Sequence, residues 1–452
     1  MFLFQLVQRR YSYLSNIFLQ FVDWLNAVLE TKQTKGNIYV LDGIRAIACL
    51  SVVMFHINLI TTRDIPLWVP QTAPSLISAL AFSGDTGVTL FFVLSGFLLF
   101  LPYARALLFD GEKWPSTWQF YIRRMLRILP VYYLSLMIIV FLFHPEYLRA
   151  DHLRQLFLFL TMFMDSSATT YRQVNGPFWT LAVEWQFYLL LPWIALAMGW
   201  LIKHSFLKKR FLTLTLCLGL MALWGIGTRF LGIYLTDHPQ ATIILPHAIM
   251  QRVLPFIYGP PINGLHGKFL EDFAVGMFVS SLFVVAQRLP KEHRFHYIME
   301  KSSPLLFLSA VSLFITMAMW KLNMGQPHIW GGIFDELNSA YNVVGEFCFA
   351  LSYGLFVTSI IFGYAWLRRP FEWKPLRWIG ILSYSIYMWH LLLLQNLTSK
   401  VVSHLSTMPN PLLYSVYWLG LLLIIVPLAF LFFTCIEKPG IRLGKTFRPS
   451  RA

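Results

Sequence analysis

The sequence of 452 residues is 57% hydrophobic and 17% aromatic, and only 13% of its residues are charged. Soluble domains carry roughly 25% charged residues, so this composition excludes a soluble globular protein and indicates an integral membrane protein. The formal net charge of +15 would suggest nucleic-acid binding in a soluble protein. In a membrane protein, Lys- and Arg-rich loops on the cytoplasmic side account for such a charge, so we expect no nucleic-acid partner.

The first 36 residues predict an amphipathic N-terminal extension. Apolar residues recur at three- and four-residue spacing from Leu14 and Phe18 through Leu25 to Leu29, which is typical of one apolar helix face. Two arginines at positions 9 and 10 interrupt the first apolar run and no small-residue cleavage site follows, so we expect no cleavable signal peptide. We expect this helix to lie on the membrane surface, with packing against the bundle as the alternative.

Residues 37–445 form one predicted membrane domain, and a basic tail follows at 446–452. Ten apolar stretches within it are long enough to cross about 30 Å of hydrocarbon, so the predicted fold is all-α and polytopic, with about ten transmembrane helices. They run over 39–62, 80–102, 128–143, 178–202, 211–235, 270–287, 304–320, 341–366, 377–397 and 411–435. If the N-terminus is cytoplasmic, most of the 36 Lys and Arg residues fall in cytoplasmic segments, which predicts that both termini are cytoplasmic.

The first span carries two polar residues, Arg45 and His56. A charged side chain within a bilayer costs at least ~2.5 kcal/mol on insertion scales. Eleven residues of helix make three turns plus about 20°, so the two side chains share a face and lie about 16 Å apart along the axis. Taken singly, Arg45 could snorkel to the interface and His56 could bond to a neighbouring helix. Their common face favours a shared function.

Other spans place ionisable residues at the depth of His56. Glu184 lies in the fourth span, His390 in the ninth, and Asp85 near the outer mouth of the second. Two imidazoles and a carboxylate at one depth suit a general base with an orienting carboxylate. The candidate catalytic residues are therefore His56, Glu184, Asp85 and His390.

The same polar residues are also candidates for a metal site and for substrate binding. Two histidines and a glutamate could hold a metal, but they share no HxxxH or ExxH spacing and the four cysteines form no CxxC pair, so we expect no metal site. Ser383 and Tyr387 lie on the helix face of His390. These two residues and Trp179, in the fourth span, are candidates for substrate binding.

An arginine cluster precedes the third span in the stretch FYIRRMLRILPVYY, residues 120–133. Arg124 and Arg127 are three residues apart and Arg123 and Arg127 are four apart, so their side chains converge on a helix. Converging guanidinium groups bind phosphate, although anchoring of the inner loop is an equal alternative for this segment alone. Because Arg45 lies at the same membrane face, we expect an anionic ligand there. Coenzyme A has a suitable shape: a charged nucleotide head, a long pantetheine arm and a reactive thioester at its tip.

Five stretches, in this order, resemble motifs of the acyltransferase 3 family of integral membrane acyltransferases: LDGIRAIACLSVVMFH, GVTLFFVLSGFLL, FYIRRMLRILPVYY, WTLAVEWQFYLLLP and LSYSIYMWH. IEKPG, at 436–440, also resembles the end of such domains, so the resemblance covers about residues 37–445. It implies transfer of an acyl group, most often acetyl from acetyl-CoA, to a hydroxyl of an envelope carbohydrate. It also predicts a multi-pass protein of the bacterial inner (plasma) membrane.

The resemblance assigns roles to five positions: Arg45 and His56 as the essential pair of the first helix, Arg124 and Arg127 in donor binding, and Glu184 as the acid of the fourth-span motif. Members of the family often have a second acid directly after that glutamate, where this chain has Trp185. Other members carry a fused extracellular esterase-like domain, for which we expect no room in this chain.

The leading hypothesis is a membrane O-acyltransferase. His56 acts as the general base or as a transient acyl carrier, Glu184 or Asp85 orients it, and the arginines hold CoA. A transporter of an envelope glycolipid or anion is the alternative, although no pair of Gly/Pro-broken helices suggests an inverted repeat. A structural partner in an envelope complex is a third. The expected partners are acyl-CoA, a carbohydrate or glycoconjugate acceptor and the lipid bilayer.

Overall fold

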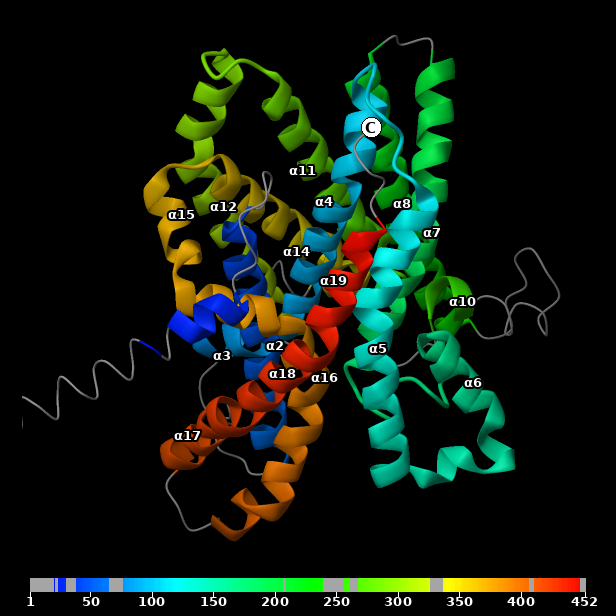
Figure 1. Cartoon of the computed structure of the whole chain (residues 1–452), viewed down its shortest axis with the longest axis vertical. Helices are drawn as coiled ribbons and strands as arrows, with labels where there is room; N and C mark the ends of the chain where they lie inside the picture. Colours follow the sequence, from blue (N-terminus) through cyan, green and yellow to red (C-terminus); the bar gives the residue numbers. More distant parts are fainter. Residues whose placement is uncertain are drawn as a thin grey trace, which may run out of the picture.

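The computed structural model describes residues 20, 23–29, 38–64, 76–205, 209–238, 255–259, 267–325, 336–405 and 410–447. Within these ranges the chain is helical and contains no strand, which confirms the all-α prediction. The longer helices are α2 (Val40–Asp64), α4 (Gly87–Leu108), α5 (Thr117–Phe143), α7 (Phe178–His204), α8 (Arg210–Asp237), α11 (Leu270–Arg288), α12 (Arg294–Gly325), α14 (Asn338–Phe362) and α16 (Lys374–Lys400). The shorter ones are α3 (Leu76–Phe82), α6 (Leu153–Thr161), α10 (Pro255–Tyr258), α15 (Ala365–Glu372), α17 (Asn410–Gly420), α18 (Val426–Phe432) and α19 (Lys438–Thr446) (Figure 1).

Nine helical stretches in the described ranges are long and apolar enough to cross a membrane. They correspond to nine of the ten predicted spans and confirm a polytopic membrane protein. The remaining prediction, 377–397, falls within α16, a helix of 27 residues that is not one of the nine. Its polar residues Ser383, Ser385 and His390 are buried in the bundle.

Two helices begin about ten residues earlier than predicted. α5 begins at Thr117 and α12 at Arg294, whereas the apolar stretches begin at 128 and 304. Hydropathy detects the part of a helix that lies in hydrocarbon, but a helix can continue through the polar interface. The arginine cluster therefore lies on α5 itself.

The predicted N-terminal amphipathic helix lies largely outside the described residues, as does most of the basic tail. The described part, 23–29, is helical and packs on the bundle. Leu29 is buried among residues of α2, α16 and α17, and the Trp24 ring lies 5.5 Å from that of Phe430. For these residues the structure favours the alternative of packing on the bundle over a position on the membrane surface.

α4 and α11 approach each other closely at two glycines. A Cβ added at Gly96 would collide with the carbonyl oxygen of Phe273, and one added at Gly276 would collide with that of Val93. Small residues let membrane helices pack backbone to backbone, where van der Waals contact rather than water drives association. This contact fixes α4, which forms one wall of the cavity described below.

Gly276→Ala should destabilise the protein by about 1–3 kcal/mol, because the added methyl group forces α11 away from α4. Thermal unfolding of the detergent-solubilised protein measures the effect. The matched control is Gly219→Ala in α8, where a Cβ meets nothing within 4 Å. Equal stability of the two variants would contradict the close approach.

α2 and α16 pack side by side and run in the same direction. Three levels of contact follow in the same order on both helices: Gly380 lies against the backbone of Asp42, the Cys49 thiol donates to the Ser383 carbonyl at 3.7 Å, and His56 meets His390. The chain then ends in a helical run through α17, α18 and α19, interrupted by π-helical segments at Leu421–Ile425 and Phe433–Glu437.

Candidate active site

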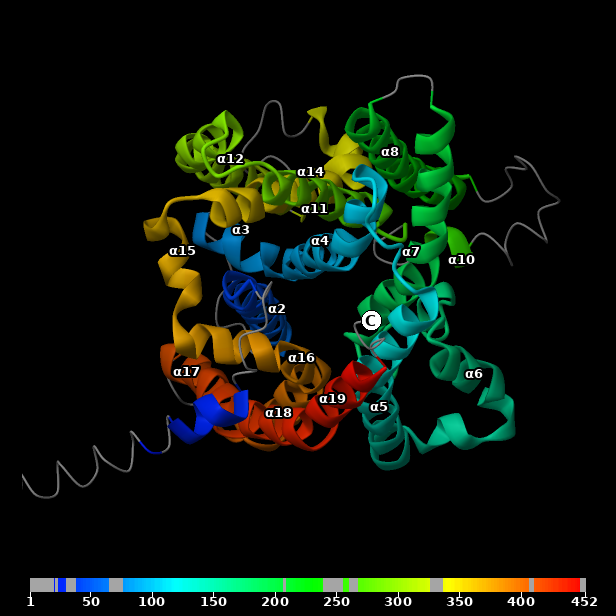
Figure 2. The same ribbon diagram turned by 45° about the horizontal axis from the view of Figure 1, so that its top comes forward.

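Helices α2, α4, α5, α7 and α16 line one cavity, and Figure 2 shows how these helices are arranged around the centre of the bundle. The cavity holds about 820 Å³ of empty space, its open mouth included. Polar and charged side chains line one part of it, and apolar side chains, most of them from α4, line the rest. The polar lining consists of Arg45, Ser95, Arg124, Arg127, Thr180, Glu184, Tyr188, Ser383, Tyr384 and Tyr387.

The arginines line the end of the cavity that lies near the beginning of α2. Arg45 Nη1 lies 3.3 Å from Asp42 Oδ1, and Arg127 Nε lies 3.9 Å from the buried carboxylate of Glu437. Arg124 has no carboxylate partner among the described residues, and its buried Nε has no hydrogen-bond acceptor. A buried guanidinium N–H without an acceptor is costly, and an anion at this end of the cavity could supply one.

Glu184 lies in the middle of the cavity, on α7. Its carboxylate accepts hydrogen bonds from the Ser95 hydroxyl and from Tyr188. Its negative charge also acts on Arg45 and Arg124. Three guanidinium groups and one carboxylate line the cavity. Arg45 and Arg127 each lie near a further carboxylate outside the lining, which leaves Arg124 as the guanidinium most available to an anion.

The opposite end of the cavity is closed by Tyr387 of α16. The Tyr387 hydroxyl shares a hydrogen bond of 2.7 Å with the hydroxyl of Thr180. Its ring lies 5.4 Å from the ring of His390, one turn further along α16. The two histidines therefore lie directly beyond the end of the cavity.

His56 and His390 form a hydrogen-bonded pair. His56 Nδ1 lies 2.9 Å from the carbonyl oxygen of Val52, and His390 Nδ1 lies 2.8 Å from that of Tyr387. A carbonyl oxygen only accepts, so each Nδ1 carries the proton in the neutral imidazole. His390 Nε2 is then an acceptor, 3.2 Å from His56 Nδ1. The lone pair on His56 Nε2 has no hydrogen-bond donor among the described residues and can act as base or nucleophile.

The prediction that Glu184 or Asp85 orients His56 is wrong. Glu184 bonds to Ser95 and Tyr188, and Asp85 forms an ion pair with Lys321 of α12. The contacts that orient His56 come from a backbone carbonyl of its own helix and from His390. Asp85 stays close enough for its charge to act on His56.

Two predicted site residues lie outside this cavity. Arg123 does not line the cavity; its backbone and the first carbons of its side chain lie beside Gly444 of α19. Of the three arginines of α5, Arg124 and Arg127 line the cavity, whereas Arg123 lies on the side of the helix that packs against α19. Trp179 does not line the cavity either, and its ring lies 5.6 Å from that of Phe269.

Four polar residues of the cavity, Ser95, Thr180, Tyr188 and Tyr384, are not among the residues predicted from the sequence. Thr180 and Tyr188 lie four residues before and after Glu184, so the helical period around that residue could have indicated both. Ser95 offers no comparable signal. Among the described residues no group of three or more His, Cys, Asp or Glu side chains could hold a metal ion.

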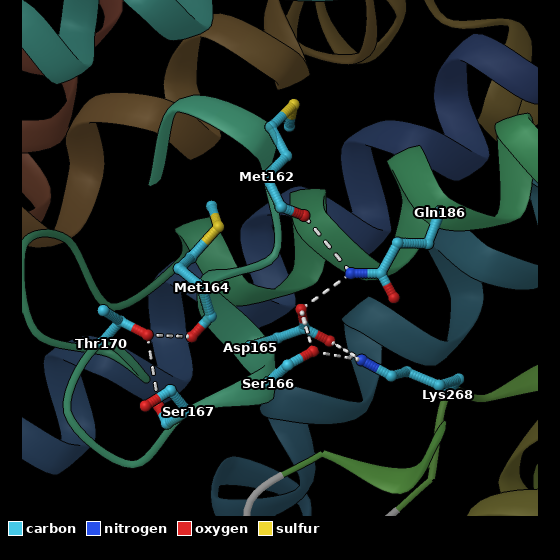
Figure 3. Close-up of polar contacts among 8 residues, drawn as sticks. All are labelled: Met162, Met164, Asp165, Ser166, Ser167, Thr170, Gln186 and Lys268. Atoms are coloured by element: carbon cyan, nitrogen blue, oxygen red, sulfur yellow. Dashed lines mark hydrogen bonds and ion pairs between the residues drawn. The ribbon is translucent and has the colours of Figure 1, made fainter. Parts of the chain in front are cut away.

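The loop before α7 is tied to the segment before α11 at the histidine end. The buried carboxylate of Asp165 forms an ion pair with Lys268 and accepts a hydrogen bond of 2.8 Å from the Gln186 amide (Figure 3). The Thr170 hydroxyl donates to the carbonyl oxygen of Met164 at 2.7 Å within the same loop. These contacts hold residues 164–170 in place beside the start of α7.

The chain is similar in sequence to several bacterial proteins. The chain is 27% identical over 400 residues to the peptidoglycan O-acetyltransferase OatA of Listeria monocytogenes, a match that covers 84% of this chain and 52% of the relative. It is 25% identical over 423 residues to the putative peptidoglycan O-acetyltransferase YrhL of Bacillus subtilis (88% and 54%). A putative O-acetyltransferase of Staphylococcus aureus is 25% identical over 372 residues (77% and 49%). The chain thus spans about half the length of these relatives.

No solved structure shows significant similarity to this chain. The model of the acyltransferase 3 family, described as an acyltransferase domain, matches residues 38–434. The matched region contains Arg45, Arg124, Arg127, Glu184 and both histidines. The chain therefore belongs to the acyltransferase 3 family and is a multi-pass membrane acyltransferase.

Proposed function

We propose that this protein is a membrane O-acyltransferase that moves an acyl group, which we take to be acetyl, from acyl-CoA to a hydroxyl group of a carbohydrate or glycoconjugate. One observation carries the proposal: an arginine-lined cavity extends beside α2 and α16 and ends next to a pair of histidines. Transport without chemistry is not carried forward, because the family is one of acyltransferases.

The cavity suits a donor with an anionic head and a long, thin arm. Arg45, Arg124 and Arg127 converge at one end, and Arg124 has a buried N–H to offer to a phosphate oxygen. Apolar residues of α4 such as Val88, Phe91 and Leu94 line the path beyond. Arg45 and His56 are about 16 Å apart along α2, close to the reach of a pantetheine arm. These features support acyl-CoA as the donor.

The neutral His56 imidazole can perform the transfer by either of two routes. As a general base, Nε2 takes the proton of the acceptor hydroxyl, the oxygen attacks the thioester carbonyl carbon, and the C–S bond breaks to leave the CoA thiolate. That thiolate takes up one proton, so acyl-CoA and ROH become the ester and CoASH. As a nucleophile, Nε2 attacks the thioester carbonyl carbon and the C–S bond breaks, which gives an acyl-imidazole and the CoA thiolate. The acceptor oxygen then attacks the acyl carbon, the C–N bond breaks, and the hydroxyl proton passes to the thiolate, so the products are again the ester and CoASH.

The acceptor follows from the relatives and the predicted orientation. Two of the relatives are named as peptidoglycan O-acetyltransferases. If the basic loops are cytoplasmic, the arginine end faces the cytoplasm, where acyl-CoA is made, and the histidine end faces outward. We propose an envelope carbohydrate as the acceptor and the bacterial plasma membrane as the site of action.

The experiment is acetyl transfer by the purified protein, with labelled acetyl-CoA and isolated envelope glycan. We expect acetylated glycan, detected by mass spectrometry, and an equal amount of free CoASH. Incubation with labelled acetyl-CoA alone, followed by rapid denaturation, distinguishes the routes: label on His56 supports the relay, and unlabelled protein supports direct transfer. If acetyl-CoA is neither bound nor cleaved with any glycan fraction, the proposed donor is wrong.

A further inference from the structure

A series of aromatic rings extends from the cavity to the outside of the bundle at the histidine end. Phe92 lines the cavity, and its ring lies 5.4 Å from that of Phe269. The Phe269 ring lies 5.6 Å from that of Trp179, which lies 5.9 Å from the ring of Tyr171. Neither the cavity nor the histidine pair accounts for the outer members of this series.

Arg172 covers the outer end of the series. Its guanidinium carbon lies 5.0 Å from the Tyr171 ring centre and 5.6 Å from that of Trp179. The residue is exposed, yet its positive charge acts on both His56 and Tyr387. Arg172 therefore lies close enough to the histidine end of the cavity for its charge to be felt at His56.

The backbone of Arg172 is held in a conformation that an arginine rarely adopts. Its φ angle is +59°, in the left-handed region, which costs a residue with a Cβ about 1–2 kcal/mol. Glycine or asparagine would avoid most of that cost at a position that needed only a turn. The network around Asp165 fixes the preceding loop, so the strain persists and holds the guanidinium beside the rings.

The charge of Arg172 is available to a ligand. Lys268, the basic residue next to Phe269, is neutralised by Asp165, whereas Arg172 forms no ion pair with any described residue. A guanidinium group stacked on aromatic rings keeps its edge N–H groups free to bind a carboxylate or a phosphate bidentately.

We propose that Arg172, Trp179 and Tyr171 form an acceptor subsite that selects an acidic carbohydrate. The apolar face of a sugar ring packs against the half-buried indole of Trp179, and a negative group on the acceptor binds Arg172. The reacting hydroxyl is thereby brought toward His56. This inference rests on the proposed function and names its substrate class: a sugar with a carboxylate, or a sugar linked to phosphate.

The test is equilibrium binding to the purified protein without any acyl donor. One pair of probes is cellohexaose and its counterpart oxidised to the carboxylate at every C6. The other pair is dodecyl glucoside and glucose linked to dodecyl phosphate. We expect the wild type to bind the charged member of one pair at least tenfold more tightly, and that pair identifies the source of the charge. Arg172→Gln should abolish the difference and Arg172→Lys should retain part of it.

Arg154→Gln is the matched control, because Arg154 is also exposed and lies on α6 in the same connection. It should keep the full preference. Equal binding within both pairs by the wild type, or a preference that Arg172→Gln retains, would overturn the subsite. Acetyl transfer without charge-selective binding refutes this inference alone, whereas charge-selective binding without transfer refutes the proposed function alone.

Discussion

His56→Ala is expected to lower acyl transfer by ~10²–10⁴-fold, the usual contribution of a positioned acid–base group, while the affinity for acyl-CoA stays nearly unchanged. The lone pair of His56 Nε2 is not engaged by the hydrogen bonds of the histidine pair, whereas the arginines proposed to bind the donor lie at the other end of the cavity. Steady-state transfer and equilibrium binding of CoA, measured on the same preparation, separate the two effects.

Two further variants sharpen this result. His390→Ala should also slow transfer, but less than His56→Ala, since His390 only positions His56 through the contact of 3.2 Å. His204→Ala is the matched control: His204 lies exposed at the end of α7 and bonds to the carbonyl oxygen of Trp200, so transfer should not change. Full activity of His56→Ala would refute the assigned role.

Charge reversal of Arg124 and Arg127 together should weaken acyl-CoA binding by at least ~100-fold. A hydrogen bond to a charged group contributes roughly 1.5–3 kcal/mol, and 1.4 kcal/mol is a factor of about ten. The double variant removes two such bonds and adds two negative charges near the phosphates. Equilibrium binding of CoA at two salt concentrations measures the loss, which should shrink as ionic strength rises.

The single variant Arg124→Gln tests the same prediction in case the double charge reversal does not fold. Arg127 approaches the buried carboxylate of Glu437, so its reversal also strains the fold, whereas Arg124 has no carboxylate partner among the described residues. The single variant should therefore keep its stability and lose roughly tenfold in affinity. Arg210→Glu is the control, because Arg210 pairs with Asp110 at the exposed start of α8, outside the cavity. Unchanged CoA affinity in Arg124→Gln would show that this residue only anchors α5.

Helical periodicity was sufficient to predict several parts of the site. It showed that Arg45 and His56 share a face of one helix and that Arg124 and Arg127 converge, and hydropathy located the spans. Contacts between distant parts of the chain could not be predicted in this way. His390 is 334 residues from His56 along the chain, and Lys321, the partner of Asp85, is 236 residues away from it. Such pairs depend on which helices lie next to each other and on how far each helix is shifted along its axis relative to its neighbour.

A common depth in the membrane did not predict which side chains contact His56. Glu184, Asp85 and His56 were predicted at a common depth, and a carboxylate next to the histidine was a reasonable expectation. The direction in which each helix turns its side chains decided the outcome: α7 directs Glu184 toward Ser95 and the arginines. No periodicity within a single helix contains that information.

The matched direction of α2 and α16 restricts how this enzyme can open. Their contacts at Gly380, Ser383 and His390 follow one another at successive heights, so a slide of α16 by a single turn, about 5.4 Å, would break all three together. The pair should therefore move as one body during turnover. Any gate that admits the acceptor or releases CoA must then be formed by α4, α5 or α7, the other helices that surround the cavity.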